Sequence, residues 1–476
     1  MKQFFLLCIF TSTILFSCKK DFLDSTYNGG IIREEYVTSL QTCNEYLNGI
    51  YVNLSSISGE YTLIYPELVA DNVKPQAGKT ILTMQYNWQQ QASEDQSSVS
   101  SNLNVYSYNF YRVITSCNFL IQRVSDFIQE DPALGNSIKG QCYAIRALLH
   151  FQLVNFFAQS PNFSPDGSHP GIVYSTSPYW YTTVNKRNTV AEVYQKMSED
   201  LKNAISLLPD NSINTLYFGK AAAKSLLARV SLFKEDYFNA KQLAREVSLS
   251  VPLMQASDGY PNDMYKMLPP NKTEVMFQLV PGSSVSLGHT GGGIFSGAYY
   301  KASKLFMPTA DMSALLSERT SDVRKVWVTN VAGVQTVTKF PSSVISDVTP
   351  ADASYFQAVI RSSEMFLTAA ECYAKLNMED SARFFLDALR KRADKNIAPL
   401  SASGAALLDS VYKERRKELS FEGLRMYDLL RWKKGVTRSD PLTTAAASLP
   451  YPSNSSIAPI PVLDVKLSGL SQNQGY

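Results

Sequence analysis

Few residues in this chain of 476 residues could carry out catalysis, and none stands at the spacing of a recognised catalytic or metal-binding motif. The sequence holds three histidines and no HExxH or GxSxG pattern. His150 lies in the apolar stretch ALLHF, which favours a satisfied core histidine over a ligand. His289 lies among glycines, where an exposed loop residue is favoured over an active-site group.

Phosphate binding and acid/base chemistry are the other chemistries that this sequence could offer. The glycines at 291–293 could cradle a phosphate, but no Lys-Ser/Thr pair follows them, which favours a flexible loop. Acidic pairs such as Glu34 and Glu35 stay open as acid/base partners, because a sequence does not show distances through space. We therefore expect no enzyme activity, no catalytic residues, no metal site and no cofactor.

The net charge of the chain indicates which classes of partner it is suited to bind. Lys and Arg total 45 against 42 Asp and Glu, which gives a net charge of +3 and no excess of cations for a nucleic acid backbone. We expect no nucleic-acid partner. Aromatic residues make up 12% of the chain, and tyrosine, whose ring carries a hydroxyl, is the commonest with 27 residues.

The first residues predict export and lipidation. Lys2 and the apolar run after it form a secretory signal that is too short to span a bilayer. Residues 15–18 read LFSC, which resembles a bacterial lipobox, although Phe16 replaces the smaller residue that is usual there. We expect a lipoprotein signal peptide at 1–17, lipidated Cys18 and a tether at 18–34. An ordinary signal peptide with a chance cysteine is the alternative.

No later stretch reaches the roughly 18 consecutive apolar residues that would cross a bilayer, so the anchor would be lipid alone. The cysteines after Cys18 are far apart and show no CxxC spacing, so we expect buried free thiols rather than disulfides or a metal site. They are Cys43, Cys117, Cys142 and Cys372.

Helical periodicity dominates the first half of the chain. Apolar residues recur at i, i+3 and i+4 over five stretches, which are ~34–54, ~99–129, ~134–158, ~189–208 and ~218–249. Thr189, with Glu192 three positions later, predicts a capping box at the start of the fourth.

Small residues stand twelve positions apart in two helical pairs, Ala228 with Ala240 and Ala370 with Ala382. The antiparallel helices of a tetratricopeptide hairpin touch at this spacing, because only a small side chain fits where the backbones come close. The two hairpins are far apart in the sequence, so we expect them embedded in an irregular body rather than in a contiguous solenoid. The expected fold class is mainly α, a single body of tetratricopeptide-like hairpins with irregular loops and a few short strands.

The segment from ~250 to ~360 has a different character. Residues 274–280 read EVMFQLV and predict a strand. Residues 326–328 and 335–338 predict a hairpin closed around Gly333.

Residues 414–432 read ERRKELSFEGLRMYDLLRW. On a helix, Glu422 and Arg425, and likewise Asp428 and Arg431, are three apart and can pair along one face while apolar residues fill the other. This pattern predicts a structural helix. The string also closely resembles the ERRxELxFEGxRxxDLxRW signature of the SusD/RagB family of outer-membrane nutrient-binding lipoproteins.

Further segments resemble the same family over essentially the whole chain. They are the lipidated start at 18–24 (CKKDFLD), the ELxxDN turn at 67–73 (ELVADNV), the helices at 219–230 (GKAAAKSLLARV) and 363–374 (SEMFLTAAECYA), and the PIP and QNxGY elements at 458–461 and 472–476. Phe366 stands where tyrosine is commoner in the family. The resemblance implies one SusD-like domain over 35–476, with an N-terminal part at about 35–250 and a loop-rich C-terminal part at about 251–476.

The resemblance also implies a role. The protein would be a lipid-anchored protein of the outer membrane, exposed at the cell surface, that captures a glycan. It would deliver that glycan to a partner SusC-like TonB-dependent transporter. Two alternatives stay open, which are a peptide ligand on the same architecture and a helical scaffold that binds no small molecule.

In this family the ligand-binding residues lie on variable loops, after the ELxxDN turn and in an inserted loop before the C-terminal helices. Sugar rings present apolar C–H faces ringed by hydroxyls, so their sites need flat aromatic side chains flanked by polar groups. Residues 86–89, which read YNWQ, offer both, although Trp88 could instead pack against the following helix. The YWY run at 179–181 is similar. The candidate ligand-binding residues are Lys79, Tyr86, Trp88, Gln91, Trp180, Tyr299 and Tyr300.

Overall fold

The computed structural model describes residues 32–58, 60–78, 82–92, 102–179, 186–210, 214–266, 268–279, 305–340 and 357–476. The expected signal peptide, Cys18 and most of the tether lie outside these residues. Within them, no helix combines the length and the apolar character needed to cross a bilayer.

Helices make up most of the described chain. They are α2 (Arg33–Tyr36), α3 (Leu40–Ile57), α4 (Glu60–Leu68), α5 (Thr83–Tyr86), α6 (Asn102–Phe127), α7 (Pro132–Phe157), α8 (Val190–Leu207), α9 (Lys220–Phe233), α10 (Tyr237–Ser250), α11 (Ala310–Ser317), α12 (Ser362–Lys375), α13 (Glu379–Ala393), α14 (Gly404–Glu418), α15 (Arg425–Arg431) and α16 (Val462–Ser468). The expected mainly α fold class is confirmed.

The described strands are short and pair two by two in antiparallel fashion. The pairs are β1 (Val73–Pro75) with β3 (Phe306–Pro308), β2 (Val275–Leu279) with β6 (Gln357–Arg361), β4 (Val328–Val331) with β5 (Val334–Val337), and β7 (Val436–Thr437) with β8 (Ser448–Leu449). The expected strand at 274–280 and the hairpin around Gly333 are confirmed. Val326 and Trp327 are exceptions, because they end a short 3-10 helix (Val323–Trp327) instead of lying in β4.

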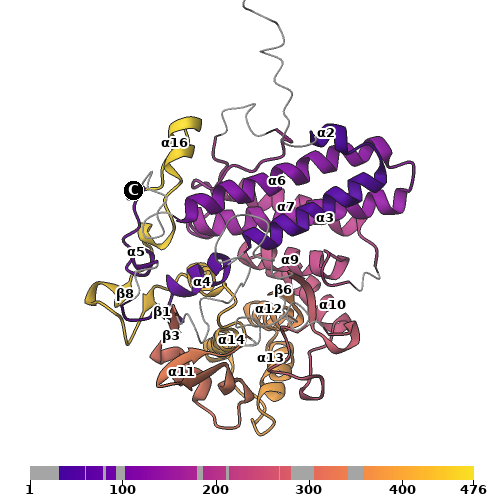
Figure 1. The fold of residues 1–476 in the computed structure, drawn as a ribbon. Helices are drawn as coiled ribbons and strands as arrows, with labels where there is room; N and C mark the ends of the chain where they lie inside the picture. The colour runs from indigo at the N-terminus through magenta and orange to yellow at the C-terminus, as the bar shows by residue number, and fades with distance from the viewer. Residues whose placement is uncertain are drawn as a thin grey trace, which may run out of the picture.

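The long helices form a continuous array in which each helix packs on the next (Figure 1). The order is α3, α6, α7, α8, α9, α10, α12 and α13. The expectation that the hairpins would not be contiguous is therefore wrong. The segment at 251–361 leaves the array after α10, and the chain returns as α12, which packs directly on α10.

The small residues that predicted the hairpins lie where two helices touch. Ala228, Ala240, Ala370 and Ala382 are all fully buried. Ala240 of α10 also packs with Cys372 of α12, so the same small side chain serves the hairpin and its neighbour. Since a larger side chain would separate these backbones, the spacing of alanines sets how closely the array stacks.

The N-terminal cap of α8 and the burial of the described cysteines agree with the predictions from the sequence. Thr189 and Glu192 form the expected capping box on α8. The described cysteines are free and buried, and burial raises the pKa of the Cys43 thiol to about 11.

The family signature is not one helix, because α14 ends at Glu418 and α15 begins at Arg425. The chain turns between them with a φ of 67° at Phe421 and 79° at Gly423. Asp428 and Arg431 pair at 2.8 Å as expected. The expected Glu422–Arg425 pair is wrong, because the turn gives each residue its own partner elsewhere.

One buried carboxylate holds this turn. Glu67 of α4 accepts hydrogen bonds from the backbone N–H groups of Phe421, Gly423 and Leu424, at 3.1, 2.9 and 3.2 Å. The Asn72 amide donates to the same carboxylate at 2.6 Å. We call this cluster the Glu67 joint; it connects the ELVADN turn to the segment that carries the family signature.

Buried ion pairs lock the remaining signature side chains into the core. Arg425 bonds both oxygens of Asp71, at 2.7 and 2.9 Å. Most of the buried charged side chains of the signature have an oppositely charged partner, which stabilises them because an unpaired buried charge is strongly destabilising. The other pairs include Arg229–Glu364, Arg415–Asp428, Arg431–Glu371, Arg361–Glu418, Arg392–Glu274 and Lys339–Glu422. The signature is therefore scaffold, as the sequence indicates.

Candidate functional site

The structure buries the two aromatic rings that were expected to form a sugar platform. Tyr86 is fully buried and Trp88 is 8% exposed. The Trp88 indole N–H donates to the Val69 carbonyl at 2.9 Å. The guanidinium carbon of Arg438 lies 4.0 Å from the centre of the Tyr86 ring and 4.2 Å from the centre of the Trp88 ring. The two rings therefore do not form the expected ligand platform. They pack on Arg438, whereas the alternative expectation was that Trp88 packs against the following helix.

Arg438 explains why these rings turn inward. Its guanidinium donates to the carbonyls of Leu68, Ala70 and Tyr86, at 2.7, 2.7 and 2.8 Å. Burial lowers the pKa of Arg438 to about 10. The carbonyls and the two ring faces thus surround a cation that has little water to solvate it.

The other candidate ligand-binding residues are either exposed or lie outside the described residues. Gln91 is exposed. Lys79, Trp180, Tyr299 and Tyr300 lie outside the described residues and stay predictions.

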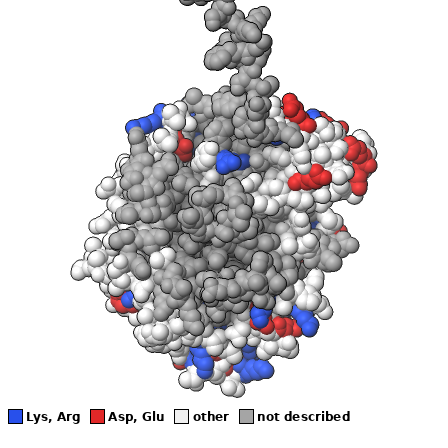
Figure 2. Space-filling view, in the orientation of Figure 1, with Lys and Arg blue, Asp and Glu red and all other residues white. Residues whose placement is uncertain are grey.

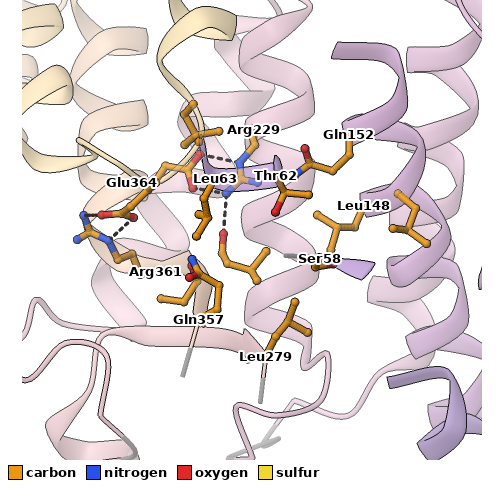
Figure 3. Close-up of a pocket in the computed structure, with 16 residues that line it drawn as sticks. Ser58, Thr62, Leu63, Leu148, Gln152, Arg229, Leu279, Gln357, Arg361 and Glu364 are labelled. Atoms are coloured by element: carbon orange, nitrogen blue, oxygen red, sulfur yellow. Dashed lines mark hydrogen bonds and ion pairs between the residues drawn. The ribbon is translucent and has the colours of Figure 1, made fainter. Parts of the chain in front are cut away.

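A small interior cavity lies where α4, α7, α9 and β6 meet (Figure 3). Its volume is about 50 Å³, whereas ligand sites for small molecules usually occupy roughly 300–1,000 Å³. Arg229 on its wall donates to both oxygens of Glu364, at 2.7 and 2.6 Å, and to the Val359 carbonyl at 3.1 Å (Figure 3). Its charged groups are therefore occupied by one another, and the cavity is part of the scaffold.

A larger groove of about 300 Å³ lies between α6, the segment 172–179 and the C-terminal residues 460–470. Two of its tyrosines are well exposed, Tyr108 at 54% and Tyr179 at 49%. The hydroxyl-bearing and aromatic residues on its walls are Ser107, Tyr108, Tyr111, Thr115, Phe157, Tyr174, Ser175, Thr176, Ser177, Tyr179 and Ser468. We call this site the tyrosine groove; exposed aromatic rings surrounded by hydroxyls are the features that sugar recognition requires.

The segment 172–179 is fixed by a neutral histidine. His150 of α7 is fully buried, and its Nδ1 bonds the Arg146 carbonyl at 2.9 Å while its Nε2 accepts from the Ser175 N–H at 3.0 Å. Burial lowers the pKa of His150 to about 3. The Tyr174 ring stacks on the imidazole with 3.8 Å between centres. The expected satisfied core histidine is confirmed, and it positions one wall of the groove.

Helix α6 holds the same wall through two further side chains. The Tyr111 hydroxyl donates to the Val173 carbonyl at 2.8 Å. The Asn118 amide donates to the carbonyls of Ser175 and Ser177, at 3.2 and 2.9 Å. The groove is thus built before any ligand enters, which reduces the entropy lost on binding.

The groove carries one cation and one carboxylate on its described walls. Arg187 donates to the carbonyls of Gly171 and Ser471, at 2.7 and 2.9 Å, and burial lowers its pKa to about 10. Burial raises the pKa of Asp464. Among the residues that the structure describes, no group of three or more His, Cys, Asp or Glu could hold a metal ion.

Sequence reasoning missed most of this site. It singled out the YWY run, which includes Tyr179, but not Tyr108 or Tyr111. A usable signal was present, because Tyr108, Tyr111 and Thr115 recur at i, i+3 and i+7 on α6 and place a polar stripe on one face of that helix.

Two family models match most of the chain between them. Residues 21–232 match a family described as "Starch-binding associating with outer membrane", and residues 294–476 match the SusD family. A curated relative, SusD-like protein P2 of Formosa agariphila, is 24% identical over 368 residues, which are 68% of this chain and 70% of that protein.

Solved structures show the same fold. A SusD superfamily protein from Bacteroides thetaiotaomicron is 26% identical, with a TM-score of 0.80 over 92% of this chain and 100% of that one. A SusD-like carbohydrate binding protein from Bacteroides vulgatus is 19% identical, with a TM-score of 0.73 over 90% and 96% of the two chains. The signature, the fold and the matches agree, and the chain belongs to the SusD/RagB family of outer-membrane-associated carbohydrate-binding proteins.

Proposed function

We propose that this protein binds a glycan in the tyrosine groove and delivers it to a SusC-like TonB-dependent transporter. The observation that supports this proposal is the pair of exposed tyrosines, Tyr108 and Tyr179, on a preformed groove lined with hydroxyl groups. A pyranose ring can stack its C–H face on an exposed aromatic ring while its hydroxyls bond the neighbouring side chains. The groove volume of about 300 Å³ lies within the range of small-molecule sites.

The polar groups on the walls suit recognition of hydroxyls. Asp464 accepts a hydrogen bond from the Ser107 hydroxyl at 3.4 Å and lies on the groove wall. A carboxylate can accept from sugar hydroxyls through its remaining lone pairs. Ser175 and Thr176 offer hydroxyls that both donate and accept, which suits a ligand whose hydroxyls do the same.

The same walls support binding without catalysis. Glycoside hydrolases generally use two carboxyl groups on either side of the scissile bond. The described walls of the groove hold Asp464 as their one carboxylate. We therefore propose that the glycan leaves the groove chemically unchanged.

The family gives the proposed setting of this binding. Lipidation at Cys18 would hold the body at the outer membrane, with the glycan site exposed at the cell surface. The partner would be the transporter, which would take up the captured glycan. Copurification of the full chain with a TonB-dependent transporter from its native membrane tests this part, and purification of the protein without one would contradict it.

Titration calorimetry of the full chain against neutral and acidic oligosaccharides, with peptides in parallel, tests the glycan site. Tyr108→Ala and Tyr179→Ala should each weaken a binding sugar about ten-fold, since a lost stacking contact is worth about 1.4 kcal/mol. Phe238→Ala is the matched control, because Phe238 is 56% exposed on α10, outside the groove. Peptide binding without sugar binding, or equal loss in all three variants, would overturn the proposal.

A further inference from the structure

A second cavity of about 360 Å³ lies beside the tyrosine groove, along the contact between α3 and α6. It shares Tyr108 and Thr115 with the groove, so the Tyr108 side chain stands between the two. We call it the cationic pocket, and its polar walls are formed by Arg33, Asn53, Ser56, Asn109, Arg112 and Ser116.

The charges of this pocket are one-sided. Two arginines line it, and no Asp or Glu is among its described lining residues. Arg33 already bonds Glu34 at 2.8 Å and the Pro178 carbonyl at 2.8 Å. Arg112 is exposed and has no ion pair with any described residue. Its guanidinium lies 5.7 Å from the centre of the Tyr108 ring, so a cation that is unpaired among the described residues lies next to the exposed ring.

This arrangement differs from that of the neighbouring groove. There Arg187 has its N–H groups committed to carbonyls, and one carboxyl group, Asp464, also lines the groove. In the cationic pocket the donors of Arg112 remain available to a ligand. A guanidinium binds carboxylate and sulfate groups through paired N–H donors, and it discriminates against neutral hydroxyls.

We propose that the cationic pocket is a subsite for an anionic sugar unit, so that the glycan is a uronate-bearing or sulfated polysaccharide. This inference rests on the proposed function. One sugar unit lies in the tyrosine groove, the chain crosses Tyr108, and the carboxylate or sulfate of a following unit meets Arg112. The amides of Asn53 and Asn109 offer donors for its hydroxyls, and the Ser56 hydroxyl, which donates to the Val52 carbonyl, can accept from them.

The test measures the affinity of the full chain for matched pairs of oligosaccharides. One pair is oligogalacturonate and its carboxyl-reduced form, and the other is a sulfated galactan oligosaccharide and its desulfated form. The acidic member of one pair should bind at least about five-fold more tightly, and the pair that shows this preference identifies the anion. The preference should decrease between 50 mM and 500 mM NaCl, since salt screens exposed charges.

Arg112→Gln should abolish the preference, so that the acidic and the neutral member of the pair bind this variant with equal affinity. Arg245→Gln is the matched control, because Arg245 is exposed on α10 and removes the same charge outside both cavities. A preference that survives Arg112→Gln, or that Arg245→Gln also removes, would overturn the subsite. Equal binding of both members, weakened by Tyr108→Ala, would overturn the subsite and leave the glycan function standing. Failure of every oligosaccharide to bind would overturn both.

Discussion

Substitution of Gly423 by alanine should damage the protein far more than substitution of an equally left-handed glycine elsewhere. Gly423 has a φ of +79°, and a Cβ built on it would stand 2.2 Å from the Thr62 carbonyl oxygen in α4. Gly333, with a φ of +82°, has nothing within 4 Å of such a Cβ. The two glycines therefore carry the same backbone strain on substitution and differ only in the contact with α4.

The expected cost follows from the Glu67 joint. The left-handed conformation costs an alanine about 1–2 kcal/mol at either position. At Gly423 the Cβ must also displace α4, which carries Glu67 and the carboxylate that accepts three backbone hydrogen bonds from the turn. Loss of one hydrogen bond to a charged group costs about 1.5–3 kcal/mol. We expect about 3–5 kcal/mol for Gly423→Ala against about 1–2 kcal/mol for Gly333→Ala.

Thermal unfolding followed by circular dichroism measures this difference. In a chain of this length 1 kcal/mol corresponds to about 1 °C in Tm. Gly333→Ala should lower Tm by about 1–2 °C and Gly423→Ala by about 3–5 °C. Equal shifts in Tm for the two variants would refute the reasoning, since they would mean that the Glu67 joint accommodates the extra methyl group without loss of stability.

Three further predictions concern the scaffold. Glu364→Gln should lower the free energy of unfolding by about 3–5 kcal/mol in urea titrations, because it leaves the Arg229 cation buried without its partner; a change below 1 kcal/mol would contradict this. Burial alone would raise the pKa of Asp71, but the Arg425 guanidinium lowers this pKa below its ordinary value of 3.8. The stability that the Asp71–Arg425 pair contributes is therefore present above pH ~4 and is lost as the pH falls. The difference in stability between the unmodified protein and Asp71→Asn should therefore shrink between pH 6 and pH 3, and a constant difference would oppose this account. A maleimide should label no thiol of the native body and four after denaturation, and rapid native labelling would contradict their burial; the thiols are Cys43, Cys117, Cys142 and Cys372.

The sequence predicted the local elements well because short-range signals determine them. The alanines at twelve-residue spacing and the capping box at Thr189 act within one hairpin or one turn, and the structure contains both. The stacking of α12 on α10 depends instead on a contact made after the chain returns from a long insertion, and no local pattern encodes it. Helix α4 was not among the predicted helices, and it contains Pro66, a residue that normally disfavours the interior of a helix.

The site was harder to predict because burial there depends on distant residues. By its residue type, Trp88 suits a sugar platform. Its ring is buried instead, because it packs on Arg438, which lies some 350 positions later in the chain. The reverse holds for Tyr108, which lies on a helix with an apolar periodicity but is 54% exposed and lines the tyrosine groove. The distribution of charge over the surface could not be predicted either. The net charge of +3 does not show that one pocket has two arginines and no Asp or Glu among its described lining residues.

Figure 2 shows where the charged side chains of the described residues lie on one face of the molecule. On the face it shows, the charged side chains of the described residues lie mainly around the rim, with acidic groups gathered at the upper right. The described surface thus carries no broad basic stripe on this face, which agrees with the small net charge.

A crystal structure of the protein with its tightest-binding oligosaccharide tests the central claim most directly. We predict a sugar ring stacked on Tyr108 or Tyr179, with hydroxyls bonded to the polar side chains of the tyrosine groove. A glycan held elsewhere, for example by residues 79–92 or 299–300 with the groove left open, would contradict the assignment of the binding site to this groove.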